Sequence, residues 1–498
     1  MIPTASNNRM QIRRTKIIAT LGPATDPAEV LEGIIEAGAD VLRINLSHGS
    51  PGEQADRVAN VRKAASKLGR EVAVLADLQG PKIRVEQFKQ GSVTLDRGDP
   101  FVLDASENPA PGDGSRIGVT YKNLPGDVEA GDLLLLDDGL ITMRVQKIEG
   151  TDVVCEVVAG GVLSSRKGLN LQGGGLSIPG IAEHDLADIE RAAAMDVDYL
   201  AVSFPRNAAD MEQARQLLRA AGSSAGLVAK IERTEAIENL ESIIDASDAV
   251  LVARGDLGVE IGDAELPGLQ KRIIRLALEQ NRIVITATQM MQSMIENPIP
   301  TRAEVLDVAN AVIDGTDAVM LSAETAVGKH PLKVVQAMHR VCLGAERHCD
   351  SQEDVRQLNV RFQRIDQAIA MAAMFMATNV SVQSIVALTE SGSTAQWLSR
   401  VRTPVPIYAL SPLASSRRRM ALHRDVYPVA HVQQWKDLNE AITEAIQTLS
   451  QAGHLSPGDR VILTSGDALG KEGGTNTLRL IQVGEGGLVE EQAELDLH

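Results

Sequence analysis

The strongest constraint on the fold is a repeated alternation of short apolar runs, rich in β-branched residues, with longer helical patterns. Runs of this kind are typical of parallel strands buried on both faces, and each such strand needs a crossover helix. Eight runs fit, at residues 16–20, 40–48 (strand and loop), 71–77, 199–203, 226–232, 249–253, 283–288 and 318–322. Three precede an interruption and five follow it, so the count predicts a (β/α)₈ barrel.

The interruption spans residues 81–184, where Gly, Pro and Asp punctuate short β-like runs such as 133–136 and 152–158. It predicts a small β domain inserted between the third and fourth βα units. A polar connector after about residue 350 leads to a separate α/β unit. Its clearest strands are 384–388, 406–410 and 460–464. We therefore expect a barrel domain (1–80 and 185–350), an inserted domain (81–184) and a C-terminal α/β domain (351–498).

Composition narrows the possible partners. The net charge of −17 and the 2% aromatic content argue against a nucleic-acid surface, which needs positive charge and stacking side chains. No apolar run is long enough to span a bilayer, and the N-terminal residues lack the apolar core of a secretion signal. The odd number of cysteines favours reduced thiols in a cytoplasmic protein. These are Cys155, Cys342 and Cys349.

Charged side chains follow two neighbouring predicted strands. Lys230 and Glu232 end one strand and point to the same side, because side chains alternate along a strand. Asp256 follows the next strand in a glycine-flanked turn with Gly255. Two carboxylates with ligand oxygens and water suit Mg²⁺ or Mn²⁺, and backbone N–H groups at the turn can hold an anion. The alternative is that both carboxylates are merely paired, with Lys230 and Arg254.

Polar residues at two-residue spacing end other strands as well. Catalytic residues of a (β/α)₈ barrel lie at the carboxyl ends of its strands, so these are candidates, although strand ends often carry polar residues for structural reasons. They are Arg43, Asn45, Ser47, Asp77, Thr286, Thr288, Ser322 and Glu324. For Glu324 a helix cap or a salt bridge to a rim cation is an equal alternative.

The C-terminal domain has a glycine-containing loop at residues 389–394, between a strand and a helical pattern. Its backbone and hydroxyl donors suit a phosphate, and residues 465–467 and 473–476 would close over it. A plain turn is the alternative.

Six of these stretches, in order, resemble the signatures of the pyruvate kinase family. They are residues 43–48, 77–84, 229–233, 252–258, 286–290 and 320–325, and the resemblance extends from about residue 14 to 483. It implies a TIM barrel with an inserted small β-barrel lid and a C-terminal regulatory domain. It also implies transfer of the phosphoryl group of phosphoenolpyruvate to ADP, giving pyruvate and ATP in the last step of glycolysis.

The resemblance also implies roles for individual residues. Glu232 and Asp256 would hold the catalytic Mg²⁺, while Lys230 and Arg43 would stabilise the phosphoryl group. The N–H groups of Gly255 and Asp256 would take the substrate carboxylate, and Thr288, with Ser322, would belong to the relay that protonates the enolate. The nucleotide positions would be Asn45, His48, Arg84 and Lys167, with a second Mg²⁺ on the nucleotide.

One departure concerns K⁺, which many members bind through positions matching Asn45, Ser47, Asp77 and the next backbone carbonyl. Those members carry an acidic residue where this chain has Lys82, and a Thr where it has Leu78. The Lys82 ammonium would supply the charge that K⁺ supplies elsewhere, so we expect an enzyme that does not require K⁺.

A second departure concerns the allosteric effector. A basic residue often present in the family's phosphate loop is replaced by Ser393, and Asp467 places negative charge opposite. Residues 77–82 and 173–175 resemble the bacterial branch that AMP or sugar monophosphates activate. We expect such an effector. Its contacts would be Thr389, Ser391, Gly392, Ser393, Thr394, Ser465 and Gly466. The family also implies a homotetramer.

Two other functions compete with this one. A different Mg²⁺-dependent barrel enzyme acting on phosphoenolpyruvate or pyruvate would use Glu232 and Asp256 but would leave Lys230 and the lid without a purpose. A catalytically silent metabolite sensor would not need the complete set of charged residues at the strand ends.

Overall fold

The computed structural model describes residues 12–348, 362, 364–403, 405–431, 438–466 and 473–490. The chain divides into two compact units, one made of residues 1–44, 55–75 and 290–498, the other of residues 45–54 and 76–289. Cys155 and Cys342 are buried free thiols, and Cys349 and Asp467 lie outside the described residues.

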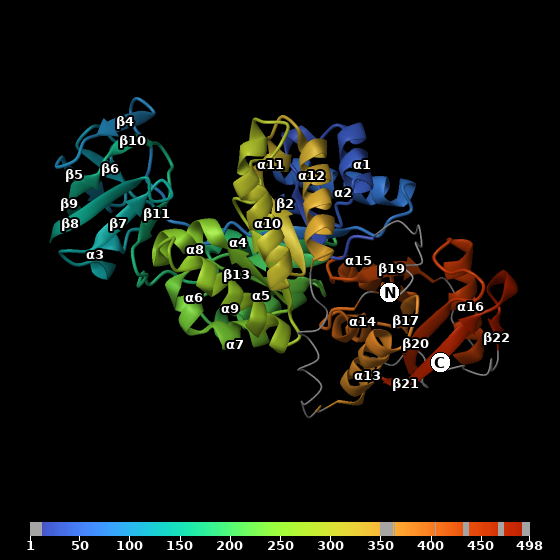
Figure 1. Cartoon of the computed structure of the whole chain (residues 1–498). Coiled ribbons are helices and arrows are strands. Elements are labelled where there is room, and N and C mark those ends of the chain that lie inside the picture. Colours follow the sequence, from blue (N-terminus) through green and yellow to red (C-terminus); the bar gives the residue numbers. More distant parts are fainter. Residues whose placement is uncertain are drawn as a thin grey trace. The chain divides into compact units, whose positions relative to one another are not determined.

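Eight parallel strands form a closed barrel, in the order β1-β16-β15-β14-β13-β12-β3-β2, which confirms the predicted fold (Figure 1). The strands are β1 (Lys16–Thr20), β2 (Val41–Asn45), β3 (Ala73–Asp77), β12 (Tyr199–Val202), β13 (Gly226–Ile231), β14 (Ala249–Ala253), β15 (Ile283–Ala287) and β16 (Ala318–Leu321). Their side chains are almost entirely buried, as expected of strands covered on both faces.

Helices connect these strands, as the predicted alternation of strands and helices requires. They are α1 (Ala28–Glu36), α2 (Pro51–Lys67), α4 (Glu183–Ala194), α5 (Ala208–Ala220), α6 (Thr234–Glu238), α7 (Leu240–Asp245), α8 (Arg254–Ile261), α9 (Leu266–Glu279), α10 (Arg302–Asp314), α11 (Ala323–Ala326) and α12 (Pro331–Glu346), with 3-10 turns η1 (Pro23–Thr25) and η2 (Gln292–Ile295). The sequence defines the ends of α10 clearly. Thr301 and Glu304 form a reciprocal cap at its start, and Gly315 ends it in the left-handed conformation at φ 102°.

The inserted segment forms a separate sheet domain around its own apolar core. Six strands pair in the order β11-β7-β8-β9-β5-β6, and β10 pairs with β4, so the hydrogen bonds form two open sheets and not one closed barrel. The elements are β4 (Ser92–Leu95), β5 (Pro100–Asp104), β6 (Arg116–Gly118), α3 (Leu124–Asp127), β7 (Leu133–Leu136), β8 (Ile141–Glu149), β9 (Asp152–Ala159), β10 (Gly161–Ser164) and β11 (Leu169–Leu171).

The C-terminal domain contains a six-stranded sheet in the order β19-β18-β17-β20-β21-β22. Alternate residues of its strands point to two apolar cores, one shared with α13 and α14 and the other with α16. The elements are α13 (Ile365–Asn379), β17 (Ser384–Leu388), α14 (Ser393–Leu398), β18 (Ile407–Ser411), α15 (Ala414–Met420), β19 (Val426–Ala430), α16 (Leu438–Gln451), β20 (Arg460–Gly466), β21 (Thr475–Val483), η4 (Glu485–Gly487) and β22 (Val489–Glu490). Arg400, just after α14, makes a buried ion pair with Asp317, just before β16, with N–O distances of 3.0 and 2.5 Å.

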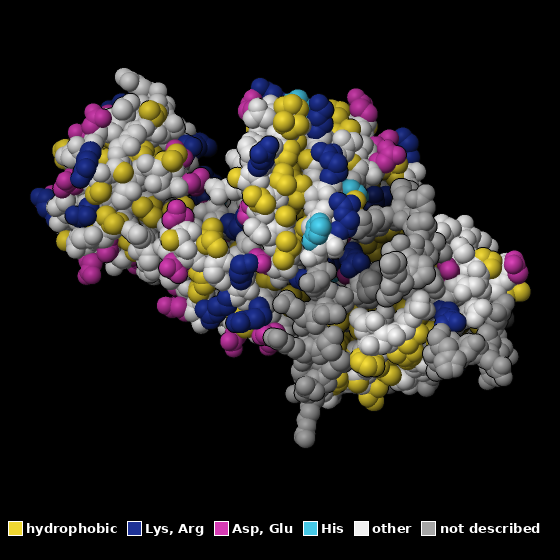
Figure 2. Space-filling model, viewed as in Figure 1, with side chains coloured by type: hydrophobic (Ala, Val, Ile, Leu, Met, Phe, Trp, Pro, Cys, Tyr) yellow, Lys and Arg dark blue, Asp and Glu magenta, His cyan; other side chains and the backbone are white. Residues whose placement is uncertain are grey.

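Hydrophobic side chains also gather on the surface over α10 and its neighbours (Figure 2). Leu306 and Ile313 of α10 are spaced by seven residues, so they lie on one face of the helix, and they are 64% and 44% exposed. Ile299, Val327 and Leu332 add exposed apolar side chains before α10, after α11 and in α12, which packs against α10. Contiguous apolar surface of this kind is typical of an interface with another protein.

Candidate active site

Lys230 lies at the carboxyl end of β13 among charged and polar groups from neighbouring strands. Its Nζ is 2.9 Å from Glu232 Oε1 and 3.3 Å from Asp77 Oδ1, at the end of β3. It also donates to Ser203 Oγ, 2.7 Å away, after β12. The ammonium is largely buried, which strengthens each of these interactions. The predicted position of Lys230 and Glu232 on one side of the strand end is therefore confirmed.

The Glu232 carboxylate is almost fully buried. Burial raises its pKa to about 7, with smaller contributions from the nearby Asp256 and Asp77 carboxylates, while the Lys230 ammonium opposes the rise. The second oxygen of Glu232 accepts the backbone N–H of Phe204 at 2.9 Å. A carboxylate held in this way has a strong preference for additional positive charge.

Asp256 lies in the first turn of α8, directly after β14. Its Oδ1 is 2.6 Å from Lys82 Nζ, just beyond the exit of β3. The alternative that paired Asp256 with Arg254 is wrong about the partner. The Arg254 guanidinium donates instead to the backbone carbonyls of Ala287 and Thr288, because α8 turns this side chain toward the end of β15.

Thr288 follows β15 with φ at +64°, a left-handed conformation that β-branched residues rarely adopt. This conformation places Thr288 Oγ1 2.8 Å from the Gly255 N–H, which it accepts, and Oγ1 itself donates to the Ala287 carbonyl. Thr286, by contrast, is fully buried within the strand. Thr288 and the start of α8 therefore form one structural element of the rim.

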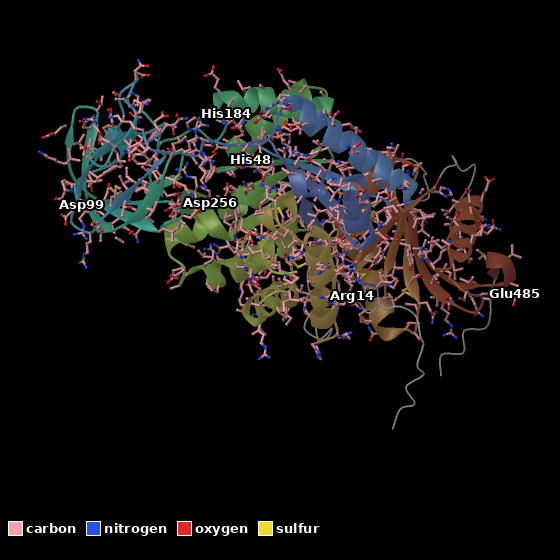
Figure 3. All side chains as sticks on the ribbon, turned by 90° about the horizontal axis from the view of Figure 1, so that it is seen from above. Arg14, His48, Asp99, His184, Asp256 and Glu485 are labelled. Carbon is pink, nitrogen blue, oxygen red and sulfur yellow. The ribbon has the colours of Figure 1, made fainter. Side chains whose placement is uncertain are left out.

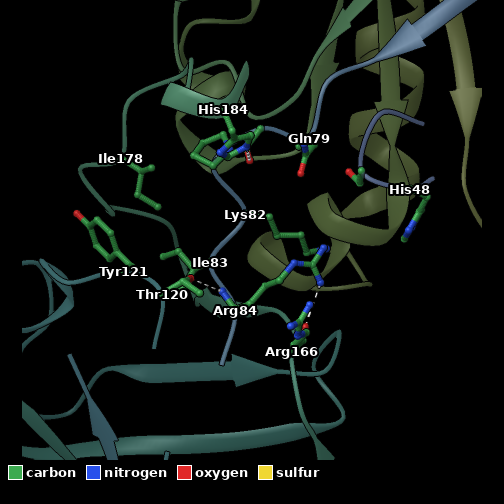
Figure 4. A pocket seen from close by; sticks show the side chains of 13 residues that line it. His48, Gln79, Lys82, Ile83, Arg84, Thr120, Tyr121, Arg166, Ile178 and His184 are labelled. Carbon is green, nitrogen blue, oxygen red and sulfur yellow. Dashed lines mark hydrogen bonds between the residues drawn. The ribbon is translucent and has the colours of Figure 1, made fainter. Parts of the chain in front are cut away.

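A cavity of about 760 Å³ lies beside this cluster, between the rim and the inserted domain (Figure 4). Figure 3 labels His48 and His184, two of its lining residues, and Asp256 of the rim. Its walls are formed by Ser47, His48, Gln79, Gly80, Pro81, Lys82, Ile83, Arg84, Thr120, Tyr121, Arg166, Ile178 and His184. Lys82, Arg84 and Arg166 give it a cluster of positive charge, which suits an anionic ligand such as a nucleotide phosphate.

Only two of the four residues predicted to bind the nucleotide line the cavity. His48 and Arg84 line the cavity, but Asn45 and Lys167 are not among its walls. Asn45 Oδ1 accepts the backbone N–H of Ser47, and the Lys167 ammonium pairs with Asp137 at 2.8 Å. Arg166 takes the cavity-lining position. Its left-handed φ of +63° reverses the chain there, which the sequence did not indicate.

Arg43, Ser322 and Glu324 belong to the other unit. An Arg43 N–H donates to Thr20 Oγ1 at 3.0 Å. Glu324 is buried and accepts the backbone N–H groups of Ser322 and Met291, at 2.7 and 3.2 Å. Of the two readings of Glu324, the cap at the start of α11 is therefore the one that its contacts support. The joint action of Arg43 and Ser322 with Lys230 stays a prediction.

Some residues of the predicted effector site are partly exposed, and others are buried within the domain. Gly392 is left-handed at φ 91°, and its N–H donates to Thr389 Oγ1 at 3.0 Å, while Ser391 and Ser393 remain partly exposed. The Thr394 hydroxyl is buried against Thr475 Oγ1 at 2.6 Å, so it serves the packing of the domain. Ser465 Oγ is buried and has no hydrogen-bond partner among the described residues. Gly466 lies so close to the Gly474 backbone that a side chain could not fit.

A divalent cation would have few protein ligands here. No group of three or more His, Cys, Asp or Glu side chains able to hold a metal occurs in the described parts of the chain. Glu232 and Asp256 offer two carboxylates, and Mg²⁺ commonly binds one or two carboxylates together with water and substrate phosphate. The oxygen donors of Glu232 and Asp256 therefore fit Mg²⁺ or Mn²⁺.

Sequence reasoning missed several residues of the site. Ser203 and Phe204 contact Lys230 and Glu232 but were not singled out, although Ser203 ends a predicted strand. Thr120, Tyr121, Ile178 and His184 reach the cavity only through folding of the inserted domain and its connections.

Among the described residues, no helix is long and apolar enough to cross a membrane.

Comparison with known proteins agrees with this architecture. The family model "Pyruvate kinase, barrel domain" matches residues 12–335, and "Pyruvate kinase, alpha/beta domain" matches residues 367–481. The chain is 53% identical to pyruvate kinase II of Salmonella typhimurium over 477 residues, covering 95% of this chain and 99% of that protein. It is 50% identical to the pyruvate kinase of Haemophilus influenzae (92% and 96% covered) and 39% identical to that of Staphylococcus aureus (95% and 81% covered). The strand-end carboxylates and lysines thus lie in a protein matched along nearly its whole length, and the chain belongs to the pyruvate kinase family.

Proposed function

We propose that the rim cluster around Lys230 carries out the family's reaction, transfer of the phosphoryl group of phosphoenolpyruvate to ADP. The observation that carries this proposal is the Lys230 ammonium, held 2.9 Å from Glu232 and close to Asp77 at the strand ends. Phosphoryl transfer depends on positioning and on stabilising charge on the moving group. Lys230 is a fixed positive charge suited to that task. The same proposal includes the division of the chain into a barrel domain (1–80 and 185–350), an inserted domain (81–184) and a C-terminal domain (351–498).

Each residue has a role in this scheme. Glu232 and Asp256 would hold Mg²⁺, which when bound neutralises charge on the phosphoryl oxygens. Arg43 would bind the phosphate. The Asp256 N–H would bind the substrate carboxylate, and the Gly255 N–H would join it on leaving Thr288 Oγ1, which accepts it at 2.8 Å in this structure. Thr288, with Ser322, would pass a proton to the enolate carbon. The inserted domain would exclude water as it closes over the nucleotide phosphates.

Nucleotide binding is assigned to the cavity beside the rim. His48 and Arg84 keep the roles proposed from the sequence, and Arg166 joins them because it lines the same cavity. Lys167 would have to approach the nucleotide by movement of the inserted domain. Asn45 ends β2 of the barrel and lies outside the cavity walls, so its contact with the nucleotide stays a prediction. A cavity of about 760 Å³ is within the range of small-ligand sites. An enzyme performing carbon–carbon chemistry on phosphoenolpyruvate would have no use for it.

Lys230→Met tests the central role. Removing the ammonium should lower kcat by about 10²–10³-fold, since one preorganised charge in a catalytic site has an effect of this size. Pyruvate formation from phosphoenolpyruvate, ADP and Mg²⁺ is measured. Lys147→Met, which removes an exposed lysine of the inserted domain, should leave kcat unchanged. Pyruvate formation at the parent rate by Lys230→Met would contradict the role of Lys230. No pyruvate formation by the parent would favour the sensor or the other barrel enzyme.

We further propose that catalysis does not require K⁺. The Lys82 ammonium is 2.6 Å from Asp256, so this rim already contains a tethered cation. Lys82 also lines the same cavity as Ser47, which is expected to form the family's monovalent-cation pocket with Asn45, Asp77 and Leu78. A covalently attached ammonium can replace the charge of a bound ion.

Steady-state assays in tetramethylammonium buffer test this proposal. The parent enzyme should reach full activity without K⁺, whereas Lys82→Glu should become dependent on added K⁺. Lys122→Glu, on the inserted domain, controls for a general effect of charge reversal. A parent enzyme that needs K⁺ would rule out the substitution of the ion by Lys82.

We also propose a phosphorylated effector with one phosphate, bound at residues 389–394 and 465–466. Support comes from the partly exposed Ser391 and Ser393 and from the buried Ser465 hydroxyl, for which no partner occurs among the described residues. The absence of a basic residue at position 393 disfavours a bisphosphate.

The effector proposal predicts kinetics. AMP, ribose 5-phosphate or glucose 6-phosphate should lower the apparent KM for phosphoenolpyruvate by about fivefold or more, the usual lower range of allosteric coupling. Inorganic phosphate at the same concentration is the control for ionic strength and for the phosphate group alone. Unchanged kinetics with all three compounds would refute the proposal.

A homotetramer of cytoplasmic protein completes the proposal. The apolar surface over α10, which includes the exposed Leu306, suits contact with a second copy of the chain. Light scattering after size exclusion should give the mass of four chains for the parent. Leu306→Glu should reduce that mass, and Leu140→Glu, on an exposed turn of the inserted domain, should not. A monomeric parent would contradict this assembly.

A further inference from the structure

Ser203 lies directly after β12 and is 2% exposed. In the barrel β12 is hydrogen-bonded between β3 and β13, and the Leu78 N–H donates to the Ala201 carbonyl at 3.0 Å. Ser203 is thereby placed between the end of β3, which carries Asp77, and the end of β13, which carries Lys230. No role was assigned to this residue from the sequence.

The Ser203 hydroxyl has one proton, and its contacts determine where that proton goes. It donates to the Leu78 carbonyl at 2.9 Å, and the Asp77 carboxylate at 3.3 Å is a longer alternative. The Lys230 ammonium is a donor without any acceptor capacity, so Ser203 Oγ must accept its N–H, at 2.7 Å. The hydroxyl therefore presents a fixed lone pair to Lys230.

The next residue contacts the partner of Lys230. Phe204 has φ at +58°, a costly conformation for an aromatic residue, and its N–H donates to Glu232 Oε2 at 2.9 Å. Two consecutive residues thus hold the two ends of one ion pair, the ammonium by a side chain and the carboxylate by the backbone. The segment is packed closely against Gly80. A side chain at position 80 would not fit, because its Cβ would lie 2.5 Å from Ser203 Cβ.

Ser203 also differs in kind from the other partners of Lys230. Glu232 and Asp77 are carboxylates, and their hold on the ammonium weakens when another cation or a substrate phosphate competes for the charges. A neutral hydroxyl keeps its hydrogen bond to Lys230 whatever the charge of the occupied site. It connects Lys230 with Asp77 and Leu78, residues of the proposed monovalent-cation pocket.

We propose that Ser203 is a positioning residue for phosphoryl transfer, a neutral anchor that holds the Lys230 ammonium in line with the moving phosphoryl group. The proposal rests on the role given to Lys230 above. A purely structural serine would satisfy the Leu78 carbonyl and stabilise the fold. A positioning serine is needed in the transition state as well, so its loss affects turnover more than substrate binding.

Ser203→Ala tests the proposal by comparing kcat, KM and thermal stability. We expect kcat to fall about 10- to 100-fold, since small misplacement of a catalytic group has effects of this size. The KM for phosphoenolpyruvate should change less than about threefold, as expected when an interaction is made mainly in the transition state. Ser247→Ala is the matched control: Ser247 is equally buried in the same unit and its hydroxyl also donates to a backbone carbonyl, that of Ile243 at 2.6 Å.

Ser203→Cys keeps the side-chain shape but is a weaker acceptor, so its kcat should lie between those of the parent and Ser203→Ala. If Ser203→Ala does not fold, the kcat of Ser203→Cys tests the proposal in its place. A kcat within twofold of the parent for a folded alanine or cysteine variant would overturn the proposal, as would an equal loss of kcat in Ser247→Ala. Failure of the underlying proposal gives a different result: the parent would then form no pyruvate, or Lys230→Met would form it at the parent rate.

Discussion

The burial of the Lys230 ammonium between the Glu232 and Asp77 carboxylates is the interaction on which the rest of the site depends. Removing charges from water is costly, and two carboxylates this close would repel each other without a cation between them. The distances of 2.9 and 3.3 Å offset part of that cost. The pKa of Glu232, raised to about 7 chiefly by burial, indicates that one ammonium compensates only in part. The rim is thus prepared for a further cation.

Lys82 places a second ammonium on the other carboxylate, Asp256. Each carboxylate that would hold Mg²⁺ therefore has a lysine as its partner. The partner of Glu232 comes from the same strand end, and that of Asp256 from the segment after β3. In a chain with a net charge of −17, these local positive charges determine whether an anionic substrate is attracted to the rim. The same arrangement is the basis of the proposal that Lys82 replaces a bound monovalent ion.

The position of Lys82 follows from the way the inserted domain is attached. Its first connection leaves β3 at Gly80, whose N–H donates to Asp185 Oδ1 at 3.0 Å. His184, at the start of α4 on the returning connection, contacts the Gly80 carbonyl at 3.2 Å. Because the two connections are held together at this point, Lys82 and Arg84 remain next to the rim, and the cavity forms where the domain begins. This geometry links the insertion to the chemistry.

The pattern of apolar runs was sufficient to predict the barrel, and alternation along β13 was sufficient to place Lys230 and Glu232 together. These inferences succeeded because they depend on the local periodicity of a strand and on the common direction of parallel strands. The alternative reading of Asp256 gave it Arg254 as its partner, but the turn into α8 directs Arg254 toward β15, and Lys82 is the partner. Arg166 lines the cavity in place of Lys167 because Arg166 itself has a left-handed backbone conformation. By itself, then, the sequence determined the barrel, the family and the position of Lys230 and Glu232 at a strand end. Only the tertiary structure decided that Ser203 and Phe204 hold the Lys230–Glu232 pair, because contacts between strands 27 or more residues apart are set by barrel closure and packing.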